Sequence, residues 1–212
     1  SEDEVVAFER YFDNDRIAAL NGIPVGGNIP SPMQLYLPQF TTLGGSETFL
    51  NLIHSGTSTA RISLSLKDNQ GENLAAGVNL RLEPSQSIRI NLVDLFGLSD
   101  PGSAITGWLL LESDSPGVVG DGEIHSFSGR AMTAVPIQGS STQRFVFSYL
   151  AQGSGISTGL TFLNPGSQSA AVLVEIFTAQ GTLLDDISLT VGGSERVVGL
   201  LGEFFSGLPD LS

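Results

Sequence analysis

The chain has 212 residues, of which 41% are hydrophobic, so it can bury one large core or two ordinary ones. A net charge of −13 argues against nucleic acid and anionic membranes as partners, because their phosphates attract Lys and Arg. No apolar run approaches the roughly 20 residues of a membrane span, and without Cys no disulfide indicates the compartment. Many short segments and 26 glycines favour an all-β fold.

The first stretch, residues 1–25, resembles a later stretch of the chain. Val5-Val6 match Val118-Val119, and Ile23-Pro24-Val25 match Val135-Pro136-Ile137. The later stretch ends a repeat, whereas no copy of the repeat precedes residues 1–25 in this sequence. The first stretch therefore predicts strands that are separated from the domain they complete.

The first of these strands is apolar on both faces and needs cover on both sides. Its apolar residues are Val5, Val6, Ala7, Phe8, Tyr11 and Phe12. The matching later strand is more polar, because Asp121, Glu123 and His125 replace Phe8, Arg10 and Phe12. Left alone, the first strand would be an aggregation-prone edge.

An internal repeat follows, in which residues 35–74 align without a gap with residues 145–184. Leu35-Tyr36-Leu37 match Phe145-Val146-Phe147, and the turn glycine Gly71 matches Gly181. Strands with one wet face are predicted where apolar and polar residues alternate, as at 61–67 and 172–176. Further strands are predicted near 47–54, 73–82, 86–91, 106–113, 117–126, 131–136, 157–163, 183–191 and 195–199.

Two short apolar stretches, 92–98 and 200–205, do not alternate and end at Gly and Pro, which is typical of short helices. We expect each helix to bridge the two sheets of a sandwich. The first copy then continues through residues 106–136, and the second copy has no counterpart of this part. Placing residues 1–25 behind 145–212 gives a nearly complete second repeat, in which only an equivalent of 106–112 is missing.

The sequence therefore predicts two tandem β-sandwich domains. Residues 1–25 are an N-terminal strand segment, 26–140 a first sandwich, and 141–212 a second, incomplete sandwich. The segment can complete the second sandwich of the same chain or of a neighbouring chain, and the latter would generate a filament. A third interpretation is that the 212 residues belong to a longer array of repeats.

Few residues suggest chemistry. Asp13 and Asp15 lie in an oxygen-rich loop that suits calcium, as does the loop 68–72, although acidic turns are common without metal. The motif G-x-S-x-G occurs at 155–159 but precedes a strand rather than the helix that a nucleophile elbow needs. His54 and its repeat partner Asn164 are interpreted as turn residues with local hydrogen bonds. Trp108 is expected in the core, and no enzyme activity and no cofactor are predicted.

The pattern TGLTFLNPG at 158–166, followed by an alternating strand and by QGTLL at 180–184, resembles repeat modules of exported bacterial and archaeal surface proteins. The first copy departs from it, with His54-Ser55 in place of Asn164-Pro165. The resemblance implies immunoglobulin-like sandwiches, an extracellular or cell-surface location and an architectural or adhesive role. We expect a structural subunit that polymerises with itself through Ser1–Val25; the alternative is a glycan- or protein-binding module.

Overall fold

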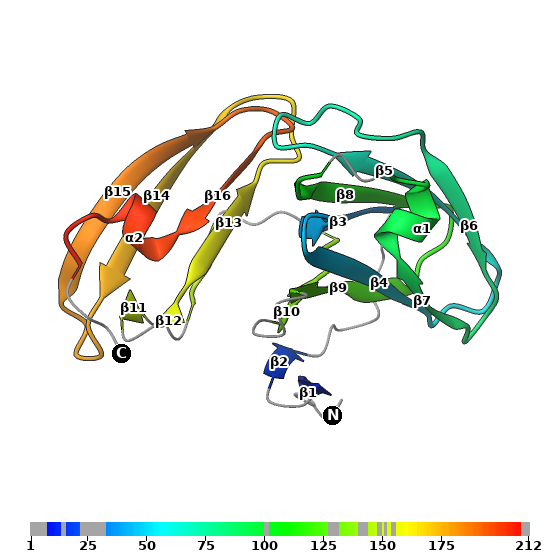
Figure 1. The fold of residues 1–212 in the computed structure, drawn as a ribbon, viewed down its shortest axis with the longest axis horizontal. Coiled ribbons are helices and arrows are strands. Elements are labelled where there is room, and N and C mark those ends of the chain that lie inside the picture. The colour runs from blue at the N-terminus through cyan, green and yellow to red at the C-terminus, as the bar shows by residue number, and fades with distance from the viewer. Residues whose placement is uncertain are drawn as a thin grey trace, which may run out of the picture. The chain divides into compact units, whose positions relative to one another are not determined.

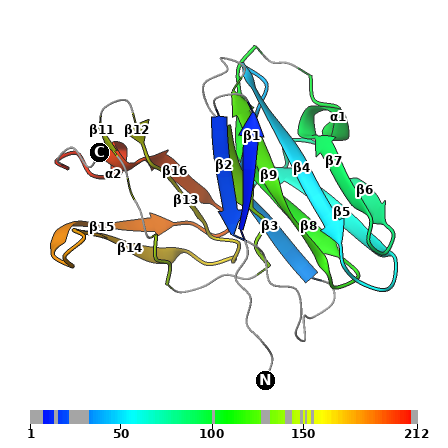
Figure 2. The ribbon, with the colours of Figure 1, turned by 90° about the horizontal axis from the view of Figure 1, so that it is seen from below.

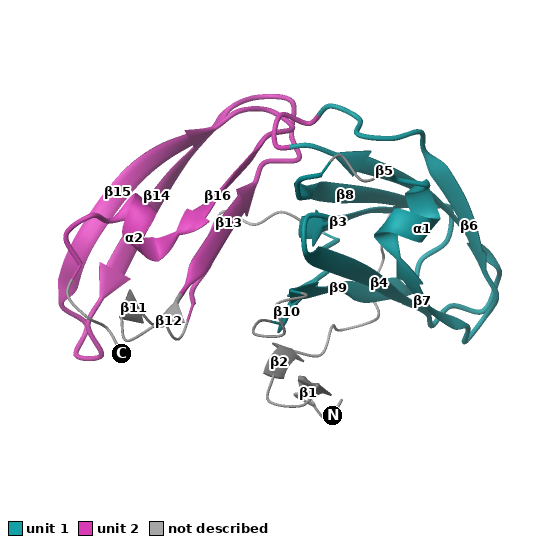
Figure 3. Ribbon diagram, in the orientation of Figure 1, with its two compact units in different colours: residues 1–68, 72–140 teal, residues 69–71, 141–212 magenta. Residues whose placement is uncertain are grey.

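Where the structure describes the chain, it is nearly all β, as predicted, with antiparallel sheets and two short helices. A computed structural model describes residues 33–99, 102–126, 132–139, 144–147, 150 and 158–208, and the backbone of 8–13, 16–21, 152–153 and 156–157. The chain divides into two compact units (Figure 3). Unit 1 comprises residues 1–68 and 72–140, and unit 2 comprises residues 69–71 and 141–212.

Unit 1 contains two four-stranded antiparallel sheets (Figure 1). The first sheet has, in spatial order, β10 (Met132–Pro136), β9 (Val118–Ser126), β4 (Ser46–His54) and β7 (Ser87–Asn91). The second has β3 (Met33–Thr42), β8 (Ile105–Ser113), β5 (Ala60–Lys67) and β6 (Val78–Leu82). Consequently β9 and β4 are central in one sheet, and β8 and β5 are central in the other.

The core of unit 1 lies between these sheets because each strand alternates between buried and exposed residues. On β5, Ile62, Leu64 and Leu66 are at most 1% exposed, whereas the residues between them face outward. Leu50 of β4 and Leu109 of β8 join the same cluster from opposite sheets. This arrangement confirms a sandwich-like architecture for unit 1.

The first predicted helix is α1 (Leu92–Phe96), which follows β7 of one sheet and precedes β8 of the other. Asn91 caps it, since its side-chain oxygen accepts a hydrogen bond of 2.9 Å from Val93 N. Gly97 ends it with a left-handed φ of 60°. The helix therefore bridges the two sheets, as the sequence predicted.

The predicted strand at 73–82 is shorter than expected, because β6 begins only at Val78. Asp68 and Glu72 close a turn after β5: Glu72 N donates to Asp68 Oδ1, and Asp68 N donates to Glu72 O. Asn73 forms only an isolated bridge to Lys67. Residues 73–77, which the sequence assigned to the strand, therefore form an isolated bridge and an irregular connection between the acidic turn and β6.

The described residues of unit 2 form three two-stranded antiparallel ladders, of which β13–β16 and β14–β15 are separate in Figure 2. They join β11 (Gln152–Gly153) to β12 (Ile156–Ser157), β13 (Gly159–Leu163) to β16 (Arg196–Leu200), and β14 (Ala170–Phe177) to β15 (Leu183–Val191). The second predicted helix, α2 (Leu201–Phe204), follows β16. A small core lies between the longer ladders and includes Leu160, Ile176, Leu201 and Phe205.

The structure confirms the internal repeat. The β4–β7 ladder of unit 1 corresponds to β13–β16, and β5–β6 corresponds to β14–β15. Backbone conformations agree at the turns, where Gly71 and Gly181 have φ of 85° and 82°. The strained positions agree as well, since Ser85 and Ser194 have φ of 63° and 61°. Each helix follows the equivalent strand, so the correspondence extends from β4 to the helix.

The N-terminal segment forms a hairpin of β1 (Phe8–Asp13) and β2 (Arg16–Asn21). It belongs to unit 1, where β2 contacts β10. By the match of Val5-Val6 with Val118-Val119, Asp13 at the end of β1 corresponds to Ser126 at the end of β9. Residues Val5 and Val6 lie outside the described residues, and the completion of unit 2 by this hairpin stays a prediction.

Candidate functional site

Unit 2 retains one half of each sheet of unit 1. In unit 1, β8 pairs with both β3 and β5, and β9 pairs with both β4 and β10. Among the described residues of unit 2, no strand takes the place of β8, β9 or β10. The ladders β13–β16 and β14–β15 therefore each end where unit 1 continues with a central strand.

Residues 144–147, the segment equivalent to β3, have no strand in the place of β8 to pair with among the described residues. Leu35 and Leu37 of β3 are 4% and 0% exposed, whereas their counterparts Phe145 and Phe147 are 55% and 59% exposed. The reason is that β3 is held in its sheet by β8 alone, apart from one isolated bridge. Without a strand in the place of β8, residues 144–147 form no ladder.

The inner face of β14 is also less covered than that of β5. Val172 and Val174 are half-buried at positions where Ile62 and Leu64 are buried. The exposed large apolar side chains among the described residues are concentrated in unit 2. They are Phe145, Val146, Phe147, Leu173, Phe177, Leu183, Leu184, Val198 and Leu200, compared with Ile53 and Leu74 in unit 1. Such concentrations of exposed apolar side chains mark interaction surfaces.

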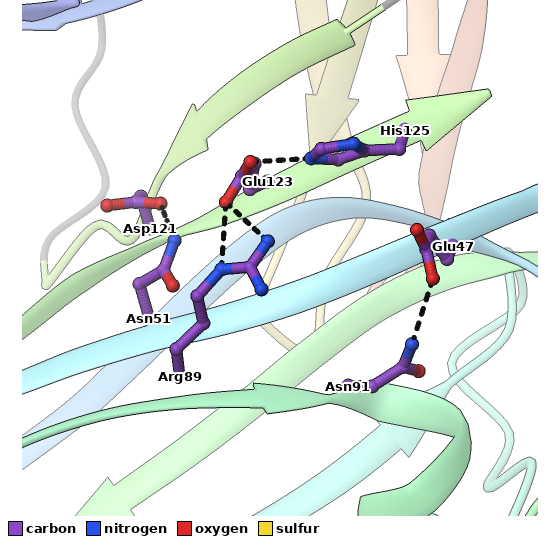
Figure 4. Close-up of polar contacts among 7 residues, drawn as sticks. All are labelled: Glu47, Asn51, Arg89, Asn91, Asp121, Glu123 and His125. Carbon is purple, nitrogen blue, oxygen red and sulfur yellow. Dashed lines mark hydrogen bonds and ion pairs between the residues drawn. The ribbon is translucent and has the colours of Figure 1, made fainter. Parts of the chain in front are cut away.

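The outer face of the β10-β9-β4-β7 sheet carries instead a row of polar side chains (Figure 4). Arg89 of β7 donates from Nε and Nη2 to Glu123 Oε2 of β9, at 3.2 and 3.1 Å. His125 Nε2 lies 2.5 Å from Glu123 Oε1. Two further pairs extend this polar row: Asn51 Nδ2 donates to Asp121 Oδ1 at 2.8 Å, and Asn91 Nδ2 donates to Glu47 Oε2 at 3.2 Å.

Arg89 reaches Glu123 across an intervening strand. Because β4 lies between β7 and β9, the two residues are about two strand spacings apart, or roughly 9–10 Å. The guanidinium crosses over the ring of Phe49 on β4, with Cζ 3.6 Å from the ring centroid. His125 contacts the same ring edge-on, with centroids 5.7 Å apart. Phe49 is therefore the apolar base of the polar row.

The pKa of the Glu123 carboxyl lies below its usual value of 4.5. Burial raises this pKa, but the hydrogen bonds from His125 and Arg89 and the positive charge of Arg89 outweigh burial. Because the folded pKa is below the unfolded one, the charged carboxylate stabilises the fold above about pH 4.5. That contribution is lost as the pH falls through the folded pKa.

Glu123→Gln is therefore expected to lower the stability of unit 1 by more at pH 7 than at pH 3, because the carboxylate contributes less as the pH falls through its lowered folded pKa. The expected loss is about 1 kcal/mol or less, since the Arg89 side chain is half exposed and its ion pair is screened by solvent. Urea unfolding followed by the fluorescence of Trp108, the single Trp, measures it. Glu112→Gln, whose carboxylate accepts only an exposed amide contact from Gln34, serves as control. A difference of equal size at both pH values would contradict the pairing.

The polar row was not predicted from the sequence, in which Asp121, Glu123 and His125 were noted only as the more polar counterparts of Phe8, Arg10 and Phe12. The available signal was the alternation of Asp121, Glu123 and His125 on one face of a strand. In the structure these groups bond to one another and to partners on β4 and β7, so the polar row is internally paired. It contains no hydroxyl or thiol nucleophile among the seven residues of Figure 4, and we assign it no reaction.

His54 closes a loop, as predicted. Its Nε2 lies 2.6 Å from Ser58 O, and the side chain is fully buried. The counterpart Asn164 donates from Nδ2 to Gln168 O at 2.7 Å, which is the equivalent carbonyl in the repeat. In both units the side chain at this position thus hydrogen-bonds the carbonyl four residues later, through an imidazole in unit 1 and an amide in unit 2.

Of the two predicted calcium loops, the structure describes 68–72 in full and 13–15 only in part. Asp13 ends β1, and Asp15 lies outside the described residues, so a site at this loop stays a prediction. In the loop 68–72, Asn69 Oδ1 accepts bonds from Nε and Nη2 of Arg196, at 3.1 and 2.8 Å. Burial lowers the pKa of Arg196 to about 10, so it stays charged at neutral pH. Across the described ranges, no three His, Asp or Glu side chains gather into a metal cluster.

The remaining predicted positions have structural explanations. Ile156–Ser157 of the G-x-S-x-G motif is a strand and Gly159 begins another, so no helix follows the Ser as a nucleophile elbow requires. Trp108 is 3% exposed and therefore buried, on the face of β8 opposite Leu109 and Leu111, which point into the core of unit 1. Neither described helix is long and apolar enough to cross a membrane.

Comparisons with known proteins identify no family. No family model matches the chain, and no curated protein matches it. A crystal structure of Thermotoga maritima 1070 is similar with a TM-score of 0.41 and 17% identity, over 52% of this chain and 95% of that chain. A similarity of this size establishes neither fold nor function, and the immunoglobulin-like assignment stays a prediction.

Proposed function

We propose that the chain is a structural subunit of an extracellular or cell-surface filament, in which the N-terminal hairpin of one copy completes unit 2 of the next. The observation that carries the proposal is the comparison of the two units. Unit 2 repeats the β4–β7 and β5–β6 ladders but leaves their inner neighbours unfilled among the described residues. The location rests on the resemblance to exported surface modules, and on no feature of the fold.

The hairpin is suited to one of these places because β1 matches β9. In unit 1, β9 pairs with β4, and the equivalent of β4 in unit 2 is formed by β12 and β13. The pairs Glu47 with His125 and Phe49 with Glu123 define the register. Transferred to the hairpin and unit 2, this register sets Phe12 opposite Ser157 and Arg10 opposite Gly159.

The outer face of the sheet supports this register, because the hairpin and β16 both carry apolar residues at positions where unit 1 carries polar ones. Where β7 carries Arg89 and Asn91, β16 carries Val198 and Leu200, which are 39% and 48% exposed. Where β9 carries Asp121 and His125, the hairpin carries Phe8 and Phe12. The ion pair of Arg89 with Glu123, which crosses β4 in unit 1, would thus be replaced by Val198 and Arg10 across β13, with Phe8 and Phe12 on either side of Arg10 on the same face.

Space for these aromatic rings is also present. Phe49, the base of the polar row, is replaced by Gly159 in unit 2, and apart from its chain neighbours no described residue has an atom within 4 Å of where a Cβ of Gly159 would be. Aromatic side chains that lie over a glycine on a neighbouring strand stabilise such pairs. Main-chain hydrogen bonds to the added strand would supply affinity. Donor and acceptor are different surfaces, so the contact does not close on itself and extends into a filament.

Leu200→Ser tests the proposal at a residue whose exposure makes it dispensable for the fold. We expect it to weaken self-association about tenfold or more, because the donor strand would otherwise bury a Leu side chain. Ile53→Ser is the matched control, since Ile53 is 45% exposed on the outer face of the equivalent strand ladder in unit 1. Sedimentation velocity over a range of concentrations measures both variants. Equal effects of the two substitutions would refute the assignment of unit 2 as the acceptor.

A further inference from the structure

The outer face of the β14–β15 ladder in unit 2 is both apolar and acidic. Leu173 and Phe177 of β14 are 58% and 52% exposed, and Leu183 of β15, which lies opposite Phe177, is 46% exposed. Glu175 lies between Leu173 and Phe177, and Asp186 is its direct partner across the ladder. Both acidic residues are exposed. These five residues form an acidic face, in which two carboxylates lie at the centre of an apolar surface.

The carboxylates of the acidic face have no positive neighbour in the part of the chain that the structure describes. There, neither Glu175 nor Asp186 forms an ion pair, and neither carboxylate accepts a hydrogen bond. Like charges directly opposite each other destabilise an antiparallel pair. The equivalent strand of unit 1 carries Ser63 and Ser65 instead of Leu173 and Glu175. The acidic face is therefore a feature of unit 2, and it would be stabilised by a cation.

The N-terminal hairpin carries a complementary surface. Phe8, Arg10 and Phe12 alternate along β1, so they lie on one face of the hairpin, which we call the basic face. Their partners on β2 are not acidic; they are Asn21, Ala19 and Ile17. Of the nine Lys and Arg residues in the sequence, Arg10 alone has aromatic residues two positions away on both sides. The basic face thus places one cation within an apolar surface and no carboxylate.

The two faces also match in spacing. On each, two large apolar residues lie four positions apart on one strand, a distance of about 14 Å, with the charged residue midway between them. Sheets that pack face to face lie about 10 Å apart, which is within reach of interdigitating side chains. Stacking of the two faces therefore brings Arg10 to Glu175 and Asp186, while the apolar side chains pack on either side.

We propose that the acidic face of one copy binds the basic face of the hairpin of another copy. This contact rests on the proposed function in one respect, since the register given above turns Phe8, Arg10 and Phe12 outward once β1 is bound at the β13 edge. The hairpin would then pair by its main chain within one filament and contact a neighbouring filament through its side chains.

The acceptor of the basic face must be a further copy. The core of unit 2 lies between the β13–β16 and β14–β15 ladders, so the outer faces of these ladders point away from each other. A hairpin bound at the β13 edge consequently cannot contact the acidic face of the same unit. The contact joins filaments side by side, into a bundle or a layer.

A charge swap in the full chain tests this contact, with filament width measured by negative-stain electron microscopy. Glu175→Lys combined with Asp186→Lys is expected to raise the protein concentration needed for bundling about tenfold or more, because like charges then meet across the contact. Addition of Arg10→Glu to this pair is expected to restore bundling. Glu72→Lys combined with Asp94→Lys is the matched control, since it changes the net charge equally at exposed positions of unit 1 and should leave bundling unchanged.

Several results would overturn the inference: an unaltered chain that forms only single filaments, bundling that survives the double reversal or is lost equally in the control, or no recovery with Arg10→Glu. Bundles that form only with calcium would do so as well, since a metal ion would then meet the carboxylates. The proposed function fails separately, if Leu200→Ser leaves filament length unchanged. If the chain forms no filament at all, sedimentation velocity of the same variants tests the contact, with loss on reversal and recovery on the swap as the expected result.

Discussion

Leu37→Ala is expected to destabilise unit 1 by about 2–5 kcal/mol, whereas the equivalent change Phe147→Ala leaves the free chain unaffected. Leu37 is fully buried between the sheets, so its removal costs transfer free energy and leaves a cavity. Phe147 is 59% exposed, and its truncation removes little packing. Equivalent positions of the repeat thus contribute strongly to the stability of unit 1 and little to that of unit 2.

Chemical unfolding at concentrations where the chain is monomeric measures both effects. Trp108 reports on unit 1, and hydrogen exchange of the β14 and β15 amides reports on unit 2. A loss above about 1 kcal/mol for Phe147→Ala, which is larger than exposed sites usually show, would mean that unit 2 packs around this residue. In that event residues 145–147 would not be an open part of an acceptor.

Deletion of residues 1–25 is expected to abolish self-association while both units stay folded. The deletion removes the donor aromatic residues Phe8, Tyr11 and Phe12 and every main-chain bond that β1 would make to β13. Unit 1 keeps both four-stranded sheets, because none of their strands comes from residues 1–25. Mass in solution measures the assembly, and Trp108 fluorescence confirms that unit 1 is intact.

The sequence predicted those features of the fold that depend on local patterns. Alternation at 61–67 and 172–176 placed β5 and β14, and Gly71 and Gly181 marked equivalent turns that the backbone angles confirm. Both helices were predicted because their apolar runs end at Gly and Pro. The loop role of His54 followed from its repeat partner Asn164, and both side chains make the expected local bond.

The polar row could not be predicted because it depends on the order of strands in the sheet. Arg89 and Glu123 meet only because β4 lies between β7 and β9, and this order joins segments far apart in the chain. The sequence does not select the sheet edge for the N-terminal hairpin, for a related reason. Its strand is apolar on both faces, so alternation alone does not select one sheet edge. Our proposal of the β13 edge rests on the comparison of the outer faces of the two units.

The mass of the native protein in solution, with and without residues 1–25, tests the central claim most directly. Strand donation predicts that the full chain forms species of increasing size with concentration, and that the shortened chain sediments as a folded monomer. A full chain that stays monomeric at every concentration would contradict the claim. So would polymers of unchanged size after the deletion, since assembly would then use another surface.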